Sequence, residues 1–208
     1  VISGSGKMAG LDPATGERLW EFDEIAGNST PTPVQADDGR FLIGASPGRG
    51  DSDGGNAARS NGMIQIRQTD DGFEASWLWR AERATCSFGS PMTHEGRAWF
   101  VNRQGVVFCL NAETGEELYA RRSPGGSVWA TPLVLGDKIY LFGKDGVTTI
   151  LENANEMNEI ATNDLWESAP QKPAEGSPNF GGPVLYAATP HDGGLLLRRG
   201  DILYCVGL

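Results

Sequence analysis

The sequence is poor in the residues that build metal centres and redox sites. It contains three cysteines and two histidines in 208 residues. Cys86, Cys109 and Cys205 lie in no CxxC or CxxCH pattern, so neither a zinc ribbon nor a c-type haem is supported. His94 and His191 have no nearby Ser or Cys in a nucleophile motif. The sequence therefore predicts no catalytic residue, and both histidines are interpreted as solvated turn residues.

Basic residues and long apolar runs are also scarce. Seventeen Lys and Arg stand against 27 Asp and Glu, which gives a formal net charge of −10. An acidic surface repels phosphate groups, so we expect no nucleic-acid partner. No apolar run reaches the ~18 residues of a membrane-spanning helix, so we expect no membrane span in this chain. The chain starts at Val1, inside an expected strand and without an initiator Met, which indicates truncation or processing and leaves targeting undetermined.

Glycine, by contrast, is abundant. The chain has 29 Gly and 12 Pro, spread along its whole length. Many tight turns imply many short strands, and a hydrophobic fraction of 39% is enough for one folded domain. The composition therefore predicts an all-β chain.

A short element recurs along the chain. Each copy has a small hydroxyl residue before Pro, then a polar turn, then an apolar strand. Successive Pro residues are 58, 41 and 58 residues apart, and a unit of 41 suits a four-stranded β-blade, with each longer interval being that unit plus 17. The four copies are Thr32-Pro33, Ser90-Pro91, Thr131-Pro132 and Thr189-Pro190.

A second element recurs in step with the first. LDPATGERLW at 11–20 and LNAETGEELY at 110–119 are 99 residues apart, the sum of one long and one short interval. Asp12 and Thr15 can hydrogen-bond the backbone of a turn, and Gly16 can adopt positive φ. Trp20 then offers a flat surface to pack on the neighbouring blade. Two independent motifs with one spacing indicate a repeat architecture.

This element resembles the tryptophan-docking motif of the quinoprotein-like (PQQ-type) repeat family. Gly10 stands where Ala is usual, and the motif is degraded at 69–79 and nearly lost at 152–160. The resemblance covers essentially the whole chain and implies a β-propeller of four-stranded antiparallel blades, in which these residues are structural contacts between blades. The matching residues are Asp12, Thr15, Gly16, Trp20, Asn111, Thr114, Gly115 and Tyr119.

The repeat spacing divides the chain, 1–208, into about four to five blades of a single domain. The resemblance implies a seven- or eight-bladed ring, of which this chain would be a part. Closure of the ring by a second chain, which would make the protein an oligomer, is the alternative. We expect a partial blade at 1–22, blades at about 29–80, 87–122 and 128–165, and a final partial blade at 183–208.

Both excess lengths fall at the same end of the expected blades. One is the loop at 47–61 and the other is the link at 165–182, and long loops on a rigid scaffold commonly carry binding sites. Tolerated insertion is the alternative interpretation. Within the first loop, Asp51, Asp53 and Asn56 could supply oxygen ligands to calcium. A flexible Gly-rich loop is the competing interpretation, because the spacing does not match an EF-hand.

Two further groups of residues, the cysteines and a pair of arginines, are interpreted from their places in the sequence. Cys109 and Cys205 occupy the same slot of the third strand in two blades, too far apart for a disulfide, and are predicted to be small buried residues like Cys86. Arg198 and Arg199 interrupt an apolar strand. They are either anion ligands near a central channel or residues of an edge strand or turn.

The family resemblance leaves two functions to compare. In the PQQ-dependent dehydrogenases, the quinone is stacked between a Trp and a disulfide of adjacent cysteines, next to a calcium ion. This sequence has no adjacent cysteines and no recognisable calcium set, so no cofactor is predicted. PQQ and calcium, with alcohol or sugar oxidation, remain the alternative. The favoured function is a non-catalytic scaffold that binds a protein or carbohydrate partner through its loop-rich end, and the resemblance implies a periplasmic or secreted location.

Overall fold

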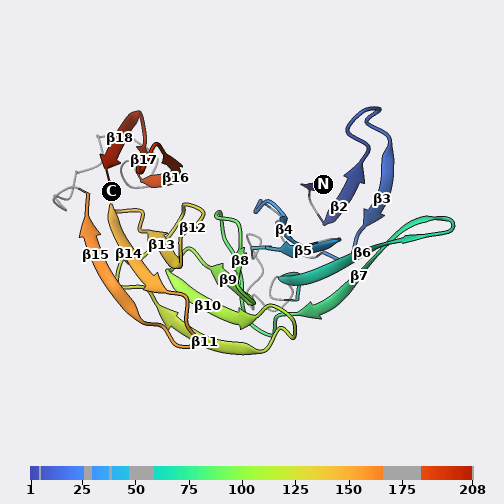
Figure 1. The fold of residues 1–208 in the computed structure, drawn as a ribbon, viewed down its shortest axis with the longest axis horizontal. Coiled ribbons are helices and arrows are strands. Elements are labelled where there is room, and N and C mark those ends of the chain that lie inside the picture. Colours follow the sequence, from blue (N-terminus) through green and yellow to red (C-terminus); the bar gives the residue numbers. More distant parts are fainter. Residues whose placement is uncertain (5, 26–29, 38, 47–58, 166–183, 208) are drawn as a thin grey trace, which may run out of the picture.

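In the computed structural model, the described residues are 1–4, 6–25, 30–37, 39–46, 59–165 and 184–207. They form five antiparallel sheets and no helix (Figure 1), which confirms the predicted all-β fold and its blade count. In every sheet each strand pairs with its neighbour in the chain, which is the connectivity of a propeller blade. We number the sheets as blades 1 to 5 in chain order. None of the described residues forms a helix long and apolar enough to cross a membrane.

The first and last blades have three described strands each. Blade 1 contains β1 (Ile2–Gly4), β2 (Lys7–Leu11) and β3 (Arg18–Phe22). Blade 5 contains β16 (Leu185–His191), β17 (Gly194–Arg199) and β18 (Ile202–Gly207).

The three central blades have four strands each. Blade 2 contains β4 (Val34–Asp37), β5 (Arg40–Ile43), β6 (Gly62–Thr69) and β7 (Gly72–Arg80). Blade 3 contains β8 (Met92–His94), β9 (Arg97–Val101), β10 (Val106–Asn111) and β11 (Glu117–Arg122). Blade 4 contains β12 (Leu133–Leu135), β13 (Lys138–Phe142), β14 (Val147–Glu152) and β15 (Glu159–Asp164).

The blades follow one another around an arc. Figure 1 shows β4, β8 and β12 on the inner side of the arc and β7, β11 and β15 on its outer side. The core lies between the blades because strand residues alternate between two faces. In β9, Ala98 and Phe100 pack toward blade 2, whereas Trp99 and Val101 pack toward blade 4. Both faces of a central blade are therefore buried, which explains the apolar runs in its strands.

Strand alternation also defines two ends of the molecule. We call the hairpin end the set of turns within the strand pairs at 12–17, 70–71, 95–96, 112–116, 136–137, 153–158 and 192–193. The linker end comprises the opposite connections, described at 23–25, 30–33, 44–46, 59–61, 81–91, 102–105, 123–132, 143–146 and 200–201.

The Ser/Thr-Pro element keeps its place in three blades but not in the fourth copy. Pro33, Pro91 and Pro132 each come directly before the first strand of a blade. Pro190 instead lies inside β16, where it pairs with Leu195. The prediction that Thr189-Pro190 is an equivalent copy is therefore wrong. A proline is tolerated there because β16 is the edge strand of its described sheet.

Candidate functional site

The two long connections of the linker end are only partly described. Residues 47–58 and 166–183 lie outside the described residues, and with them the calcium candidates Asp51, Asp53 and Asn56. The described residues on each side of the first connection belong to a buried polar network. Asn61, which is fully buried, accepts hydrogen bonds through Oδ1 from the N–H groups of Ala45 (2.9 Å) and Cys86 (3.2 Å). Its Nδ2 donates to the Ala45 carbonyl at 3.0 Å, so one side chain fixes both flanks of this connection.

A chain of hydroxyl groups connects the linkers of successive blades. The N–H of Thr32 donates to Ser90 Oγ at 2.9 Å, and the N–H of Ser90 donates to Thr131 Oγ1 at 3.0 Å. Each acceptor hydroxyl belongs to the residue before the repeated proline. The repeat was visible in the sequence, but its role as a blade-to-blade hydrogen bond was not.

Two aromatic rings lie together at the linker end. Phe88 and Trp129 have ring centroids 4.7 Å apart and a tilted geometry. They occupy equivalent slots, three residues before Pro91 and Pro132. Phe88 is 46% exposed, whereas Trp129 is half-buried. A large exposed aromatic side chain at a fixed position is a common feature of binding surfaces.

A hydrogen-bonded frame supports this aromatic pair. Trp129 Nε1 donates to Ser127 Oγ at 3.2 Å, and Ser127 Oγ donates to the carbonyl of Arg103. The N–H of Arg103 donates to Ser87 Oγ at 2.7 Å. Within the described part of the chain, the exposed guanidinium of Arg103 forms no hydrogen bond or ion pair. We call Phe88, Arg103 and Trp129 the aromatic patch. In the sequence it could have been found from the aromatic residues that stand three positions before the repeated proline in two linkers.

At the hairpin end, two turns have the same internal hydrogen bonds. Asp12 Oδ1 accepts from the N–H groups of Ala14 (2.7 Å) and Thr15 (3.2 Å), and Thr15 Oγ1 accepts from Glu17. Gly16 has φ 74°. The turn that begins at Asn111 repeats these contacts with Glu113, Thr114 and Glu116, and its Gly115 has φ 75°.

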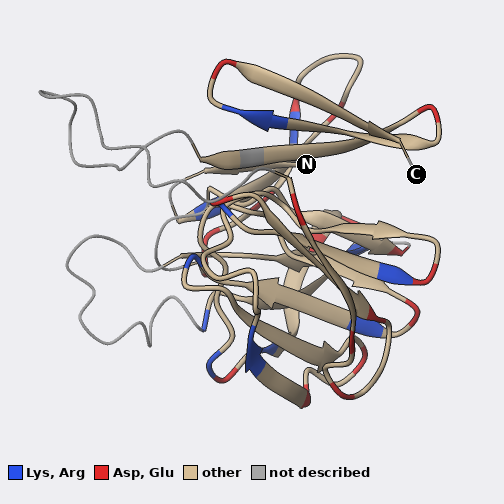
Figure 2. Ribbon diagram, turned by 90° about the vertical axis from the view of Figure 1, so that its left-hand side faces the viewer, with Lys and Arg blue, Asp and Glu red and all other residues tan. Residues whose placement is uncertain are grey.

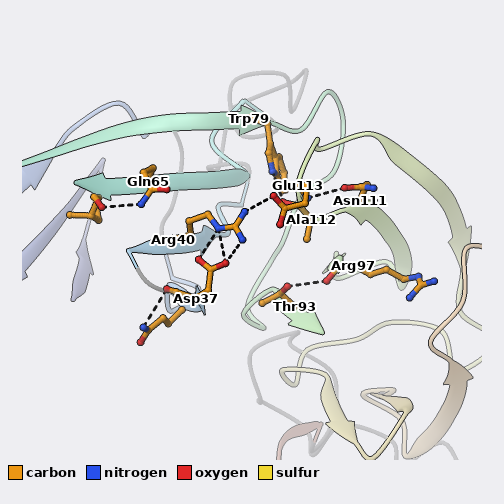
Figure 3. Close-up of polar contacts among 11 residues, drawn as sticks. Asp37, Arg40, Gln65, Trp79, Thr93, Arg97, Asn111, Ala112 and Glu113 are labelled. Atoms are coloured by element: carbon orange, nitrogen blue, oxygen red, sulfur yellow. Dashed lines mark hydrogen bonds and ion pairs between the residues drawn. The ribbon is translucent and has the colours of Figure 1, made fainter. Parts of the chain in front are cut away.

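The second of these turns receives a tryptophan from the preceding blade. Trp79, at the end of β7, donates its indole N–H to the Ala112 carbonyl at 2.8 Å (Figure 3). A Cβ on Gly115 would lie 2.6 Å from Trp79 Cδ2, so only glycine leaves room for the ring. The unit at 69–79, whose motif is degraded in sequence, therefore still supplies the aromatic residue.

The other two aromatic residues of the motif have different surroundings. Trp20 lies over Gly10 of its own sheet, where a Cβ would be 2.1 Å from Trp20 Nε1, which explains a glycine in the place of the usual alanine. Tyr119 is buried, and its hydroxyl accepts a hydrogen bond from Trp99 Nε1 at 3.1 Å. Burial raises the pKa of Tyr119 above its usual range.

Polar bridges between blades add to these aromatic contacts. Arg40 donates to Asp37 of its own blade and to Glu113 Oε2 of blade 3 at 2.7 Å (Figure 3). Arg40 therefore lowers the pKa of both carboxyl groups. Arg97, at the same strand position in blade 3, donates to Asn153 and Asn155 of blade 4, at 3.0 Å each.

The structure corrects the interpretation of one histidine and one cysteine. His191 is exposed as predicted. His94 ends β8 rather than lying in the turn, and its side chain is only partly exposed: among the described residues its buried Nε2 has no hydrogen-bond partner, and Glu95 Oε1 lies 3.8 Å away. Cys86 and Cys109 are buried as predicted. Cys205 is exposed, because its face of β18 is covered by no other described residues.

Other candidate ligands are not brought together. Arg198 and Arg199 lie at the end of β17, between β16 and β18, and exposed Arg198 donates through Nε to the Gly200 carbonyl at 3.1 Å. Within the described ranges, no group of three or more His, Cys, Asp or Glu could hold a metal ion.

The two ends differ in charge. The described turns of the hairpin end contain ten acidic residues and no Lys or Arg. Figure 2 shows many of the red turn tips on one side of the blades. The linker end mixes both signs and includes Arg59, Arg83, Arg103 and Lys144. The ten acids are Asp12, Glu17, Asp70, Asp71, Glu95, Glu113, Glu116, Asp137, Glu156 and Asp192.

The comparison with protein families agrees with this architecture. A family model described as outer membrane protein assembly factor BamB matches residues 4–201. The chain belongs to this family. The match confirms the PQQ-like repeat family that was predicted from the docking residues. No curated protein matches the sequence.

Solved structures with little sequence identity share the fold. The N-terminal domain of Nup159 is 11% identical over 98% of this chain and 50% of that domain, with a TM-score of 0.57. The computationally designed protein Ika8 is 12% identical over 99% of this chain and 66% of its own, with a TM-score of 0.50. BamB from Moraxella catarrhalis is 18% identical and has a TM-score of 0.48. The alignment includes 99% of this chain but only 65% of that BamB, so this chain spans about two thirds of its length.

Proposed function

We propose that this protein is a non-catalytic propeller scaffold that binds a protein partner through its linker end. The observation that carries the proposal is the aromatic patch of Phe88, Arg103 and Trp129. Membership of the BamB family supports a role in outer membrane protein assembly, in the extracytoplasmic space. Aromatic and Arg side chains are the types most enriched among residues that dominate binding energy.

The aromatic patch is arranged to bind without reorganisation. Trp129 is held by Ser127, and the Arg103 backbone is held on both sides by Ser87 and Ser127. A partner that covers Phe88 gains about 1 kcal/mol, since the ring is half exposed and full burial of a Phe contributes about 1.5–3 kcal/mol. Little side-chain freedom is lost in return, because the neighbouring groups are already ordered.

Charge supports the linker end over the hairpin end. A partner at the hairpin end would have to be strongly basic, because that end presents carboxylates without Lys or Arg in its described turns. At the linker end, the exposed guanidinium of Arg103, which has no ion-pair partner among the described residues, suits a neutral or acidic protein surface. A carbohydrate could also stack on the exposed ring, so the experiment below includes that outcome.

The residues present do not fit the PQQ cofactor of the related dehydrogenases. The quinone would need adjacent cysteines, but the three cysteines of this sequence are far apart in the chain. Burial raises the pKa of both the Cys86 and Cys109 thiols to about 12, so neither is a reactive thiolate. We therefore expect PQQ with calcium to leave the melting temperature unchanged. A cofactor-dependent rise in Tm with dye-linked alcohol oxidation would support the dehydrogenase instead.

Site-specific photocrosslinking tests the scaffold. A benzophenone amino acid is placed at Phe88 in the full-length protein in its native cells, and at Phe73 as a control. Phe73 is 39% exposed on β7, next to the hairpin end. We expect a discrete protein adduct from position 88 alone, and its loss when Trp129→Ala is added. Equal adducts at both positions, or adducts to polysaccharide alone, would overturn the proposal.

A further inference from the structure

A groove on the outer rim separates blades 3 and 4. It has a volume of about 560 Å³ and runs along β11 beside the turn between β14 and β15. At the hairpin end, Leu118 and Met157 are partly buried against the core, and charged side chains stand at both ends of the groove. The lining residues that matter are Leu118, Arg121, Arg122, Glu156, Met157 and Glu159.

The docking contact beside this groove differs from the contact at the preceding boundary. Between blades 2 and 3, Trp79 covers the turn of the next blade and bonds to Ala112. Between blades 3 and 4, the docking residue is Tyr119, whose hydroxyl bonds inward to Trp99. The next turn, at 153–158, has no glycine to receive a ring. The outer part of this boundary is therefore more open than that of the preceding boundary.

An equivalent groove lies between blades 2 and 3, and the two grooves differ in volume and in the pairing of their charges. That groove is smaller, about 460 Å³, and two of its lining charges are neutralised within the chain. Arg80 pairs with Glu24, and Glu117 pairs with Arg83. Among the described residues, none of the four charged groups that line the blade 3–4 groove forms an ion pair. Arg121 and Arg122 donate hydrogen bonds to the carbonyls of Ala120 and Gln104, and Glu159 accepts one from the Thr162 hydroxyl. These partners are uncharged, so the four charges are not neutralised by the described residues.

The charges of the groove are segregated along its length. Glu156 and Glu159 lie at the hairpin end, beside Leu118 and Met157. Arg121 and Arg122 lie at the other end of β11, toward the linker end. β11 has six residues, so the two charged ends are separated by roughly 20 Å or less of extended chain. A strand-like segment of about six residues matches this length.

The groove leads toward the aromatic patch. Arg122 donates to the carbonyl of Gln104 at 2.7 Å, and Gln104 follows Arg103 of that patch. The basic end of the groove is therefore joined to the turn that contains Arg103. A protein bound at the linker end can place a flanking segment in the groove without a change in this chain.

We propose that the groove between blades 3 and 4 binds an extended segment of the protein partner, with basic and apolar residues facing Glu156, Glu159 and Met157 and acidic residues facing Arg121 and Arg122. This inference rests on the proposed scaffold function and adds the chemistry of the partner. Each exposed ion pair contributes little alone. The order of the charges along the segment, combined with one apolar contact, determines the specificity.

Fluorescent synthetic peptides test the charge order. The probe has two lysines, two leucines and two aspartates in blocks, with blocked termini, and is made in both chain directions. The control has the same composition with lysine and aspartate alternating. Fluorescence anisotropy should show one block peptide binding the full-length protein at least ten-fold more tightly than the control. Equal affinities, or no binding of either block peptide, would overturn the proposal.

Reversing the charge at the basic end of the groove shows whether a loss of peptide binding comes from the groove itself or from unfolding of the protein. Arg121→Glu with Arg122→Glu should weaken binding of the block peptide at least ten-fold. It should also strengthen binding of a peptide with lysines at both ends, a gain that an unfolded protein cannot give. Arg67→Glu, at an exposed position of β6 away from the groove, is the control and should change neither affinity. If the double variant gains nothing, the groove is not the binding site.

Two outcomes distinguish the groove from the scaffold function. Phe88→Ala should leave peptide binding unchanged, because the ring does not line the groove. A cross-link at position 88 without peptide binding would overturn the groove alone. A second copy of this chain in the groove would appear as a dimer in analytical ultracentrifugation that Arg121→Glu with Arg122→Glu dissociates, and it would also overturn the proposal.

Discussion

The indole of Trp79 donates a hydrogen bond to the carbonyl oxygen of Ala112, across the boundary between blades 2 and 3. The two residues are 33 positions apart, and the ring covers Gly115 of the same turn. Asn111 holds that turn in shape from within. One contact therefore combines aromatic burial, a buried hydrogen bond and a turn that only glycine permits.

Trp79→Ala should lower the free energy of unfolding by about 3–5 kcal/mol, because a buried Trp leaves a large cavity and an unsatisfied carbonyl. Trp79→Phe keeps most of the ring volume and should cost about 1–3 kcal/mol, chiefly the lost hydrogen bond. Urea unfolding followed by circular dichroism measures both. No loss for Trp79→Phe would mean that the hydrogen bond to Ala112 contributes nothing, and equal losses for the two variants would mean that the ring volume contributes nothing.

Gly10→Ala restores the residue that is usual in the repeat, yet here it should destabilise the protein. The new Cβ would lie 2.1 Å from Trp20 Nε1, and relieving that overlap costs about 1–3 kcal/mol. Gly4→Ala in the adjacent strand is the control, because its Cβ would meet nothing within 4 Å. The difference in Tm between the two variants is the measurement. If Gly10→Ala proved as stable as Gly4→Ala, Trp20 would not pack over Gly10 as described.

The Arg40 bridge predicts a particular acid sensitivity. Hydrogen bonds from Arg40 hold the pKa of Asp37 and Glu113 below their ordinary values of 3.8 and 4.5. In acid the unfolded chain binds more protons at these groups, so their stabilisation is complete above about pH 5 and is lost as pH falls through the lowered values. Arg40→Met should flatten the fall in urea midpoint between pH 5 and 3. Arg67→Met should keep the wild-type slope, and an unchanged slope for Arg40→Met would contradict the prediction.

The cysteines should differ sharply in reactivity. Burial raises the pKa of Cys86 and Cys109 to about 12, so both remain protonated and shielded at neutral pH. Cys205 is exposed. A thiol reagent with a chromogenic leaving group should therefore titrate one thiol rapidly in the native protein and three after denaturation. Cys205→Ser should remove the fast phase, and a remaining fast phase would show that a buried cysteine is accessible.

The sequence predicts the parts of this fold that are local. Alternating residues and turn glycines place the strands, and Asp12 and Asn111 act within turns of a few residues, where spacing alone is informative. The partner of Trp79 could not be predicted in the same way. Its turn lies in another blade, and only the angle between the sheets decides which turn a ring reaches.

The candidate site was hardest to predict because it lies in linkers. Phe88 and Trp129 stand in irregular segments, where no periodicity separates a buried from an exposed ring. The sequence around Pro190 resembles the other Ser/Thr-Pro copies, but Pro190 lies inside a strand. The same order of residue types can occur at a different position relative to the strand. The exposure of Cys205 depends on what packs against β18, which the residues of β18 do not encode.

The hydrogen bonds from Thr32 to Ser90 and from Ser90 to Thr131 have a mechanical consequence. The hydroxyls of Ser90 and Thr131 tie these linkers to one another, so we expect a force applied to one linker to be shared by its neighbours along the inner rim. A protein that pulls on residues 81–91 therefore strains two blade boundaries together. We expect the inner rim to respond to such a pull as one unit rather than as a row of independent loops.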